Sequence, residues 1–210
     1  MTVFLDHILW GTPDLSAGEK LFEQLSGVKP GPGGIHEGFG TRNALLSMGD
    51  QLFFEIIAPD PAQNLNGNRG GRLAKLAGPG LTALSVRSDD LPAMEAAAKK
   101  LGLPVRGPIP GGRTRGDGVR LHWEILYFGE GQDADMIPFA IDWKGSPHPA
   151  GTTPGGIGFK SVVALHPDSE RLSAIYTALG IPVPVLRGDR AGFQAVLTSP
   201  RGDITLTTAA

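Results

Sequence analysis

The 210-residue sequence contains no cysteine. Disulfides, thiolate nucleophiles and cysteine-bound zinc or iron–sulfur centres are therefore excluded, and a metal ion would have to sit on His, Asp or Glu. A large excess of either charge is missing too, because the formal net charge is only -2. Charges of both signs are interspersed along the chain, so we expect neither nucleic acid nor a membrane surface as a partner.

Long apolar runs are also missing. None approaches the roughly 18 residues that a membrane span requires, and Met1 leads into an apolar strand without the basic and apolar regions of a signal peptide. We therefore expect a cytoplasmic protein. What the chain has in abundance is 31 glycines and 18 prolines, which is typical of short strands joined by tight turns.

One pattern occurs three times along the chain. Three segments begin with the letters TPDL, SDDL and HPDS, continue as amphipathic helices and stop at Gly27, Gly102 and Gly180. Each segment follows an apolar stretch of strand length and precedes further stretches of strand length. The repeat therefore predicts three copies of a βαβββ unit.

Two stretches with the composition of linkers divide these copies: 64–71 is rich in Gly, Asn and Arg, and 147–156 is rich in Pro, Gly and Thr. The expected modules are residues 1–63, residues 72–146 and a third, partial module at 157–210. A single βαβββ unit leaves one face of its sheet bare, so modules must pair. We predict an α+β fold in which the first two modules form a curved mixed sheet with a concave site. The third packs beside them or completes a homodimer.

Five segments resemble a known superfamily: DHILWGTPDL, PGGIHEGFGTRNALLSMGD, FFEIIAPDP, GRTRGDGVRLHWEI and PFAIDWKGSPHPA. The sequence is similar to the vicinal oxygen chelate superfamily, which includes glyoxalase I, extradiol dioxygenases and bleomycin-resistance proteins, and within it to the glyoxalase-like domain group. The resemblance implies a divalent metal held by a histidine of the first strand and a glutamate of the fourth. In this chain those positions are His7 and Glu55.

The later modules depart from that pattern of ligands. Aligned on the helix starts, the positions that should match His7 and Glu55 fall near Ala83, Ser161, Ala140 and Thr208. None of these side chains binds a metal, so a glyoxalase I site with two histidines and two glutamates is not supported. A dioxygenase site would need a further histidine, for which the candidates are His36, His122 and His148.

His7 and Glu55 also have interpretations without a metal. If Phe54 and Ile56 face the core, strand alternation directs Glu55 into the concave side, where a carboxylate could act as a base as readily as a ligand. His7 is a ligand, a general base or a core histidine satisfied by a neighbour.

The candidate substrate-binding side chains are two cations, two flat rings, a loop histidine and a strand amide: Arg113, Arg115, Trp123, Trp143, His36 and Asn43. Guanidinium groups hold carboxylates at two points, and aromatic rings supply apolar walls. Each residue also has an ordinary explanation in a solvated hairpin, a core, a surface loop or a strand edge. His122 alternates with Trp123, so only one faces the site, and we expect Trp123. A structural role at a proline-rich turn explains His148 better than catalysis does.

The resemblance implies a small-molecule enzyme of lyase, isomerase or dioxygenase type acting on a vicinal-oxygen or carbonyl substrate, and the arginines would steer a substrate carboxylate. The alternative is a non-catalytic binding protein of bleomycin-resistance type, and a third reading is a module whose site has decayed. No nucleotide cofactor is expected, because PGPGG and GNRGG lack the lysine and the strand-to-helix context of phosphate-binding loops.

Overall fold

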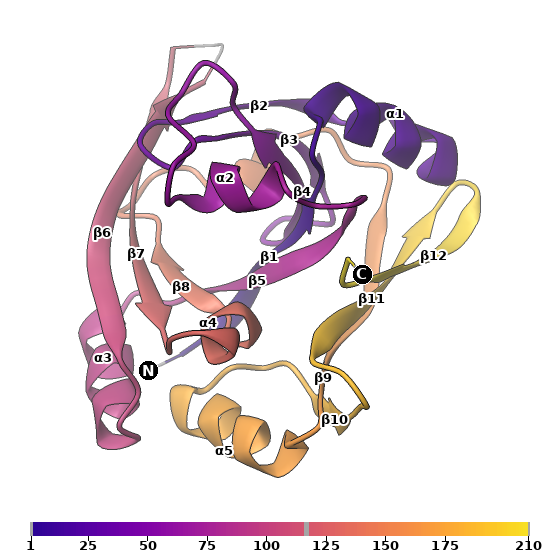
Figure 1. Ribbon diagram of the computed structural model, residues 1–210. Helices are drawn as coiled ribbons and strands as arrows, with labels where there is room; N and C mark the ends of the chain where they lie inside the picture. The colour runs from indigo at the N-terminus through magenta and orange to yellow at the C-terminus, as the bar shows by residue number, and fades with distance from the viewer. Residues whose placement is uncertain (1, 116–117, 210) are drawn as a thin grey trace.

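The computed structural model describes residues 2–115 and 118–209 (Figure 1). The first module comprises β1 (Phe4–Gly11), α1 (Leu15–Ser26), β2 (Gly31–His36), β3 (Thr41–Ser47) and β4 (Phe53–Pro59). The second comprises β5 (Gly80–Arg87), α3 (Leu91–Lys100), β6 (Val105–Thr114), β7 (Arg120–Phe128) and β8 (Phe139–Asp142). The third comprises β9 (Gly158–His166), α5 (Ser169–Leu179), β10 (Val185–Arg187), β11 (Gly192–Ser199) and β12 (Gly202–Thr207).

Three short helices lie between these elements: α2 (Arg69–Leu73), α4 (Gln132–Met136) and the 3-10 helix η1 (Pro149–Gly151). Two of them fall in the stretches expected to be linkers, since α2 begins inside 64–71 and η1 lies inside 147–156. Of the helices in the described ranges, none is both long enough and apolar enough to cross a membrane.

The acidic start and glycine stop of each repeat are helix caps. The three starting carboxylates each accept a hydrogen bond from the backbone N–H three residues later, as N-caps do: Asp14, Asp90 and Asp168. The three glycines follow the helices in the left-handed region, where a side chain would be strained: Gly27 (φ 75°), Gly102 (φ 70°) and Gly180 (φ 69°). The same local chemistry therefore begins and ends all three helices.

The first two modules share one eight-stranded sheet in the order β2-β3-β4-β1-β5-β8-β7-β6. The antiparallel pair β1 and β5 joins the modules at the centre, and each of these strands also pairs in parallel with the last strand of its own module. The sheet curls strongly, as Figure 1 shows. This confirms the predicted α+β fold of βαβββ modules in a curved mixed sheet.

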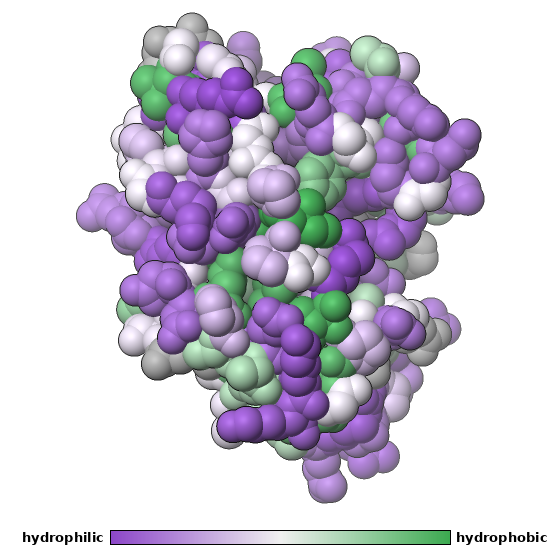
Figure 2. Space-filling view, turned by 90° about the vertical axis from the view of Figure 1, so that its left-hand side faces the viewer, coloured by the Kyte–Doolittle hydropathy of each residue, from purple (hydrophilic) through white to green (hydrophobic). Residues whose placement is uncertain are grey.

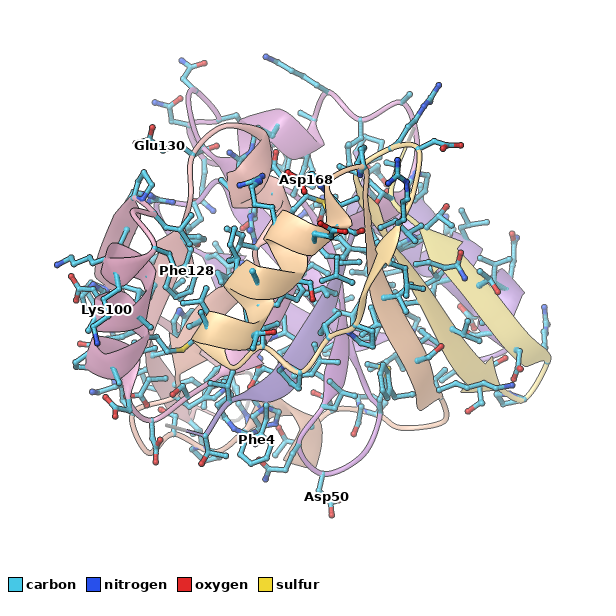
Figure 3. All side chains as sticks on the ribbon, turned by 90° about the horizontal axis from the view of Figure 1, so that it is seen from below. Phe4, Asp50, Lys100, Phe128, Glu130 and Asp168 are labelled. Carbon is cyan, nitrogen blue, oxygen red and sulfur yellow. The ribbon has the colours of Figure 1, made fainter. Side chains whose placement is uncertain are left out.

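The third module forms a separate four-stranded sheet, β10-β9-β11-β12. It packs with α1 and α3 against the convex face of the large sheet, in one continuous apolar core that includes Phe22, Phe54, Leu84 and Tyr176. Figure 3 shows α5 between α3, marked by Lys100 at its end, and the strands of the small sheet. The concave face therefore remains free of the third module's sheet.

Side chains of β1 and β4 alternate between these two faces. Ile8 and Phe54 belong to the core under the helices, whereas Leu9 and Phe53 belong to a second cluster on the concave face. On one face of the molecule, Figure 2 shows hydrophobic surface set back between hydrophilic side chains. The alternation leaves Glu55, between two core residues, directed to the concave side.

Candidate active site

The concave face holds a pocket of about 610 Å³, part of which is open to solvent. Strands of both modules contribute its lining. Seven of the side chains singled out from the sequence lie in it: His7, His36, Asn43, Glu55, Arg113, Trp123 and Trp143. Arg115, His122 and His148 are not among the lining residues. Arg115 follows the end of β6, and His122 is exposed on β7.

His7 and Glu55 meet in the middle of this pocket. They come from the paired strands β1 and β4, and His7 Nε2 lies 3.4 Å from Glu55 Oε2. Each residue is only 4% exposed. An ionisable pair that is shielded from water in this way interacts much more strongly than one on the surface.

Asp6 holds the other side of the His7 ring. The pairing of β1 with β5 skips one residue between Leu5 and His7, and this β-bulge brings the Asp6 carboxylate to His7 although the two are neighbours in a strand. His7 Nδ1 lies 2.6 Å from Asp6 Oδ1. Sequence analysis missed this role because the bulge has no sequence signature; the adjacent letters DH were the only signal.

Two further rings bind the same carboxylate. Trp143 Nε1 donates to Asp6 Oδ2 over 3.0 Å, and His148 Nε2 lies 3.0 Å from the same oxygen. Burial by itself would raise the pKa of Asp6, but the hydrogen bonds of His148 and His7 outweigh burial and hold that pKa well below its usual range. Asp6 is therefore ionised, which fixes the His7 proton on Nδ1 and leaves Nε2 facing Glu55.

Asn43 orients Glu55 from the opposite side. Its Oδ1 accepts a hydrogen bond from the Gly34 backbone N–H over 2.7 Å, so its amide nitrogen must point the other way. That nitrogen donates to Glu55 Oε1 over 2.6 Å and lies 3.2 Å from His36 Nε2. His36 Nε2 therefore accepts, and its Nδ1 donates to Thr41 Oγ1 over 3.0 Å.

This network makes His36 a neutral ring. Burial lowers its pKa, and although the Glu55 charge opposes the shift, the charges of Arg113 and Arg69 add to it. His36 Nε2 is 4.0 Å from Glu55 Oε1, so it borders the central pair without bonding to it directly.

A divalent metal does not fit these donors. The Asn43 amide hydrogens occupy Glu55 Oε1 and His36 Nε2, which leaves only His7 Nε2 and Glu55 Oε2 open in the middle of the pocket, fewer than the three protein ligands of a usual metal site. His148 is bonded to Asp6 instead of facing Glu55. Across residues 2–115 and 118–209, no group of three or more His, Asp or Glu side chains is placed to hold a metal ion.

Aromatic rings and two arginines complete the walls. Phe53 stacks on His7 at 4.4 Å between ring centroids, and Trp123 meets Trp143 edge to face at 5.6 Å. Burial lowers the pKa of Arg113, partly offset by the Glu55 charge. Arg69 of α2 also lines the pocket, and sequence analysis missed it because its segment has the composition of a linker.

Of the solved structures similar to this chain, one supports the fold over nearly its whole length. A hypothetical protein from Staphylococcus aureus is 18% identical, with a TM-score of 0.65 over 99% of this chain and 86% of that one. Methylmalonyl-CoA epimerase from Streptomyces coelicolor is 19% identical over 67% of this chain and 96% of that one, with a TM-score of 0.47. The epimerase from Mycobacterium tuberculosis is 21% identical over 66% and 85%, also at 0.47.

Among curated proteins, none matches the sequence. The family described as the glyoxalase-like domain matches residues 5–180, which is most of the chain. The chain therefore belongs to the glyoxalase-like domain family, within the vicinal oxygen chelate superfamily that its sequence resembles.

Proposed function

We propose that the protein is a small-molecule enzyme that moves a proton beside a carbonyl group, with Glu55 and His7 as its acid–base pair. The observation that carries this proposal is the 3.4 Å approach of His7 Nε2 to Glu55 Oε2 inside a largely apolar pocket. Paired titratable groups in such surroundings are the usual basis of proton transfer. Of the reactions implied by the family resemblance, isomerase and lyase chemistry need only this pair.

The proton transfer follows from the hydrogen-bond network. With the His7 proton fixed on Nδ1, the Nε2 lone pair and a Glu55 oxygen repel each other unless a proton lies between them, so the pair is suited to taking up one proton. A substrate C–H bond breaks, its electrons move onto the carbonyl oxygen as an enolate, and the proton passes to Glu55 Oε2. Return of the proton at a neighbouring atom gives an isomer, and loss of a leaving group gives a lyase product.

Arg113 is suited to stabilising the negative charge that this reaction creates on the carbonyl oxygen. Its guanidinium lines the pocket, and no carboxylate of the described chain lies within ion-pair distance of it. A cation shielded from water at this place would hold a substrate carboxylate or the enolate oxygen. We therefore assign Arg113 to substrate binding, with Trp123 and Trp143 as the flat walls beside it.

The test is exchange of carbon-bound hydrogen with solvent. 2-Oxo acids, 2-hydroxy aldehydes and 1,2-diones are incubated with the protein in deuterium oxide, and loss of the proton next to the carbonyl is followed by NMR. Glu55→Gln should slow exchange of any active compound by at least about a hundredfold. Exchange that is equally fast in Glu55→Gln would refute the role of Glu55. Activity that disappears with chelator and returns with added metal would refute the metal-free mechanism.

The aromatic walls favour one alternative, a binding protein of bleomycin-resistance type. Trp123, Trp143 and Phe53 could hold a flat ligand without chemistry. In that case a ligand would bind equally well to wild type and Glu55→Gln, Trp123→Ala would lose it, and no compound would exchange hydrogen.

A further inference from the structure

A groove lies beside the pocket and shares three of its lining residues, Arg69, Tyr127 and Phe139. Its walls come from α2, α4, β5 and β7 together with Arg106 and the residues 208–209 that follow β12. The space measures about 1150 Å³ and is partly open to solvent. Since the shared residues form the border between the two, one molecule could occupy both.

Two guanidinium groups stack along that border. Arg106 Cζ lies 4.3 Å from the centre of the Tyr127 ring, and Arg69 Cζ lies 5.3 Å from the centre of the Phe139 ring. The two rings are neighbours at 5.5 Å. Stacking engages the flat faces of the guanidinium groups, and their N–H edges stay available for a ligand.

A third guanidinium, that of Arg72 in α2, lines the same groove. In the described part of the chain, none of Arg69, Arg72 and Arg106 has a carboxylate oxygen within 4.0 Å. One carboxylate, that of Asp135, shares the lining with them. The groove is therefore positive on balance in a chain whose formal net charge is -2, and it favours an anion.

We propose that this groove binds a phosphate-like anionic group on the same molecule whose reactive carbonyl occupies the pocket. The inference rests on the proposed function for what happens at Glu55, but binding in the groove needs no turnover. Arg69 reaches both spaces and would contact the part of the molecule that joins the two ends. The substrate class is thus a carbonyl compound with an anionic tail, such as a phosphate ester.

Three probes test this by titration calorimetry: inorganic phosphate, phenyl phosphate and benzyl alcohol. Phenyl phosphate should bind at least about tenfold more tightly than either of the others, because only it offers both an aryl group and an anion. Arg72→Gln and Arg106→Gln should each lower the affinity for phenyl phosphate by about tenfold. Arg190→Gln removes an exposed arginine of the third module and should leave binding unchanged.

Two results would overturn the proposal. If inorganic phosphate bound as tightly as phenyl phosphate, the groove would hold a free anion and no substrate tail. If both arginine variants bound phenyl phosphate like wild type, the groove would not be an anion site. If a Gln variant fails to fold, Arg106→Lys replaces it. This substitution keeps the charge but loses the planar group that stacks on Tyr127, so it should still bind phenyl phosphate more weakly than wild type. Binding of phenyl phosphate requires no proton transfer. The measured affinities would therefore test the groove even if the hydrogen-exchange experiment at Glu55 failed.

Discussion

Asp6 connects two parts of the chain that lie far apart in sequence, the first strand and the segment that follows β8. Its two oxygens bond the ring of His7 in β1, the ring of Trp143 directly after β8 and the ring of His148 directly before η1. The segment PFAIDWKGSPHPA carried part of the family resemblance, and the structure gives its Trp and its His this shared role. A buried carboxylate with three ring partners fixes both the orientation of His7 and the position of the chain after β8.

Replacing Asp6 should therefore cost stability as well as activity. We expect Asp6→Asn to lower the free energy of unfolding by about 2–4 kcal/mol, because an amide cannot accept from all three rings and its own N–H groups would be buried without partners. Urea denaturation measures the difference. Asp203→Asn is the matched control, since that exposed carboxylate pairs with Lys160 alone among the described residues and should cost under about 1 kcal/mol. Equal losses in the two variants would contradict the role given to Asp6.

Asn43 decides whether the pocket can hold a metal. Its amide donates where a cation would bind, so Asn43→Asp should turn the donor into a ligand beside Glu55, His7 and His36. We expect this variant to bind zinc or manganese at one site per chain, and wild type to bind neither, in calorimetric titrations at neutral pH. Asn43→Leu removes the amide without adding a charge and serves as the control. Stoichiometric metal in wild type would show that the donor arrangement had been misread.

At the scale of elements, the glycines of β2 position the Asn43 amide. A Cβ atom on Gly33 would lie 1.9 Å from Asn43 Oδ1, which only glycine avoids. Gly33 of PGPGG therefore serves the close approach of β2 to β3, a role that composition alone could not distinguish from turn flexibility.

Gly33→Ala should displace that amide and with it Glu55. We expect the substitution to lower the free energy of unfolding by about 1–3 kcal/mol, the usual cost of forcing extra volume into a packed site. Gly78→Ala is a control, because a Cβ there meets nothing within 4 Å. Thermal denaturation of both variants compares them. A Gly33→Ala protein as stable as the Gly78→Ala protein would mean that Asn43 can move aside at little cost.

Much of the element order could be predicted, because periodicity and caps are local. The repeat with its acidic starts and glycine stops gave the three βαβββ units, and strand alternation gave the inward direction of Glu55. Two features depended on tertiary structure instead. The bulge that turns Asp6 toward His7 is set by pairing with β5, and the entry of Arg69 into the pocket is set by how α2 folds over β4.

For the whole molecule, stability should fall in two steps as the pH falls. His36 is neutral when folded because its pKa is lowered from an ordinary 6.5, so the unfolded chain binds one more proton below that value. Asp6 stays ionised when folded, and its contribution is lost as the pH falls below its ordinary 3.8 toward the folded value. The contributions of these two groups to the free energy of unfolding should therefore be largest above about pH 7.

Urea denaturation as a function of pH separates the steps. His36→Gln should remove the part of the fall that begins near pH 6.5, and Asp6→Asn should reduce the part below pH 4. His122→Gln, at an exposed position on β7, should leave the profile unchanged. An unaltered profile in His36→Gln would mean that His36 is not held neutral by burial.

The central claim is that Glu55 and His7 act as one unit on one proton. The most direct measurement is the rate of hydrogen exchange with an active carbonyl compound in Glu55→Gln, His7→Gln and the double variant. We predict that all three fall to the same residual rate, because removing either partner disables the pair and removing the second costs nothing more. Losses that multiply in the double variant, or a single variant that keeps the wild-type rate, would contradict the account.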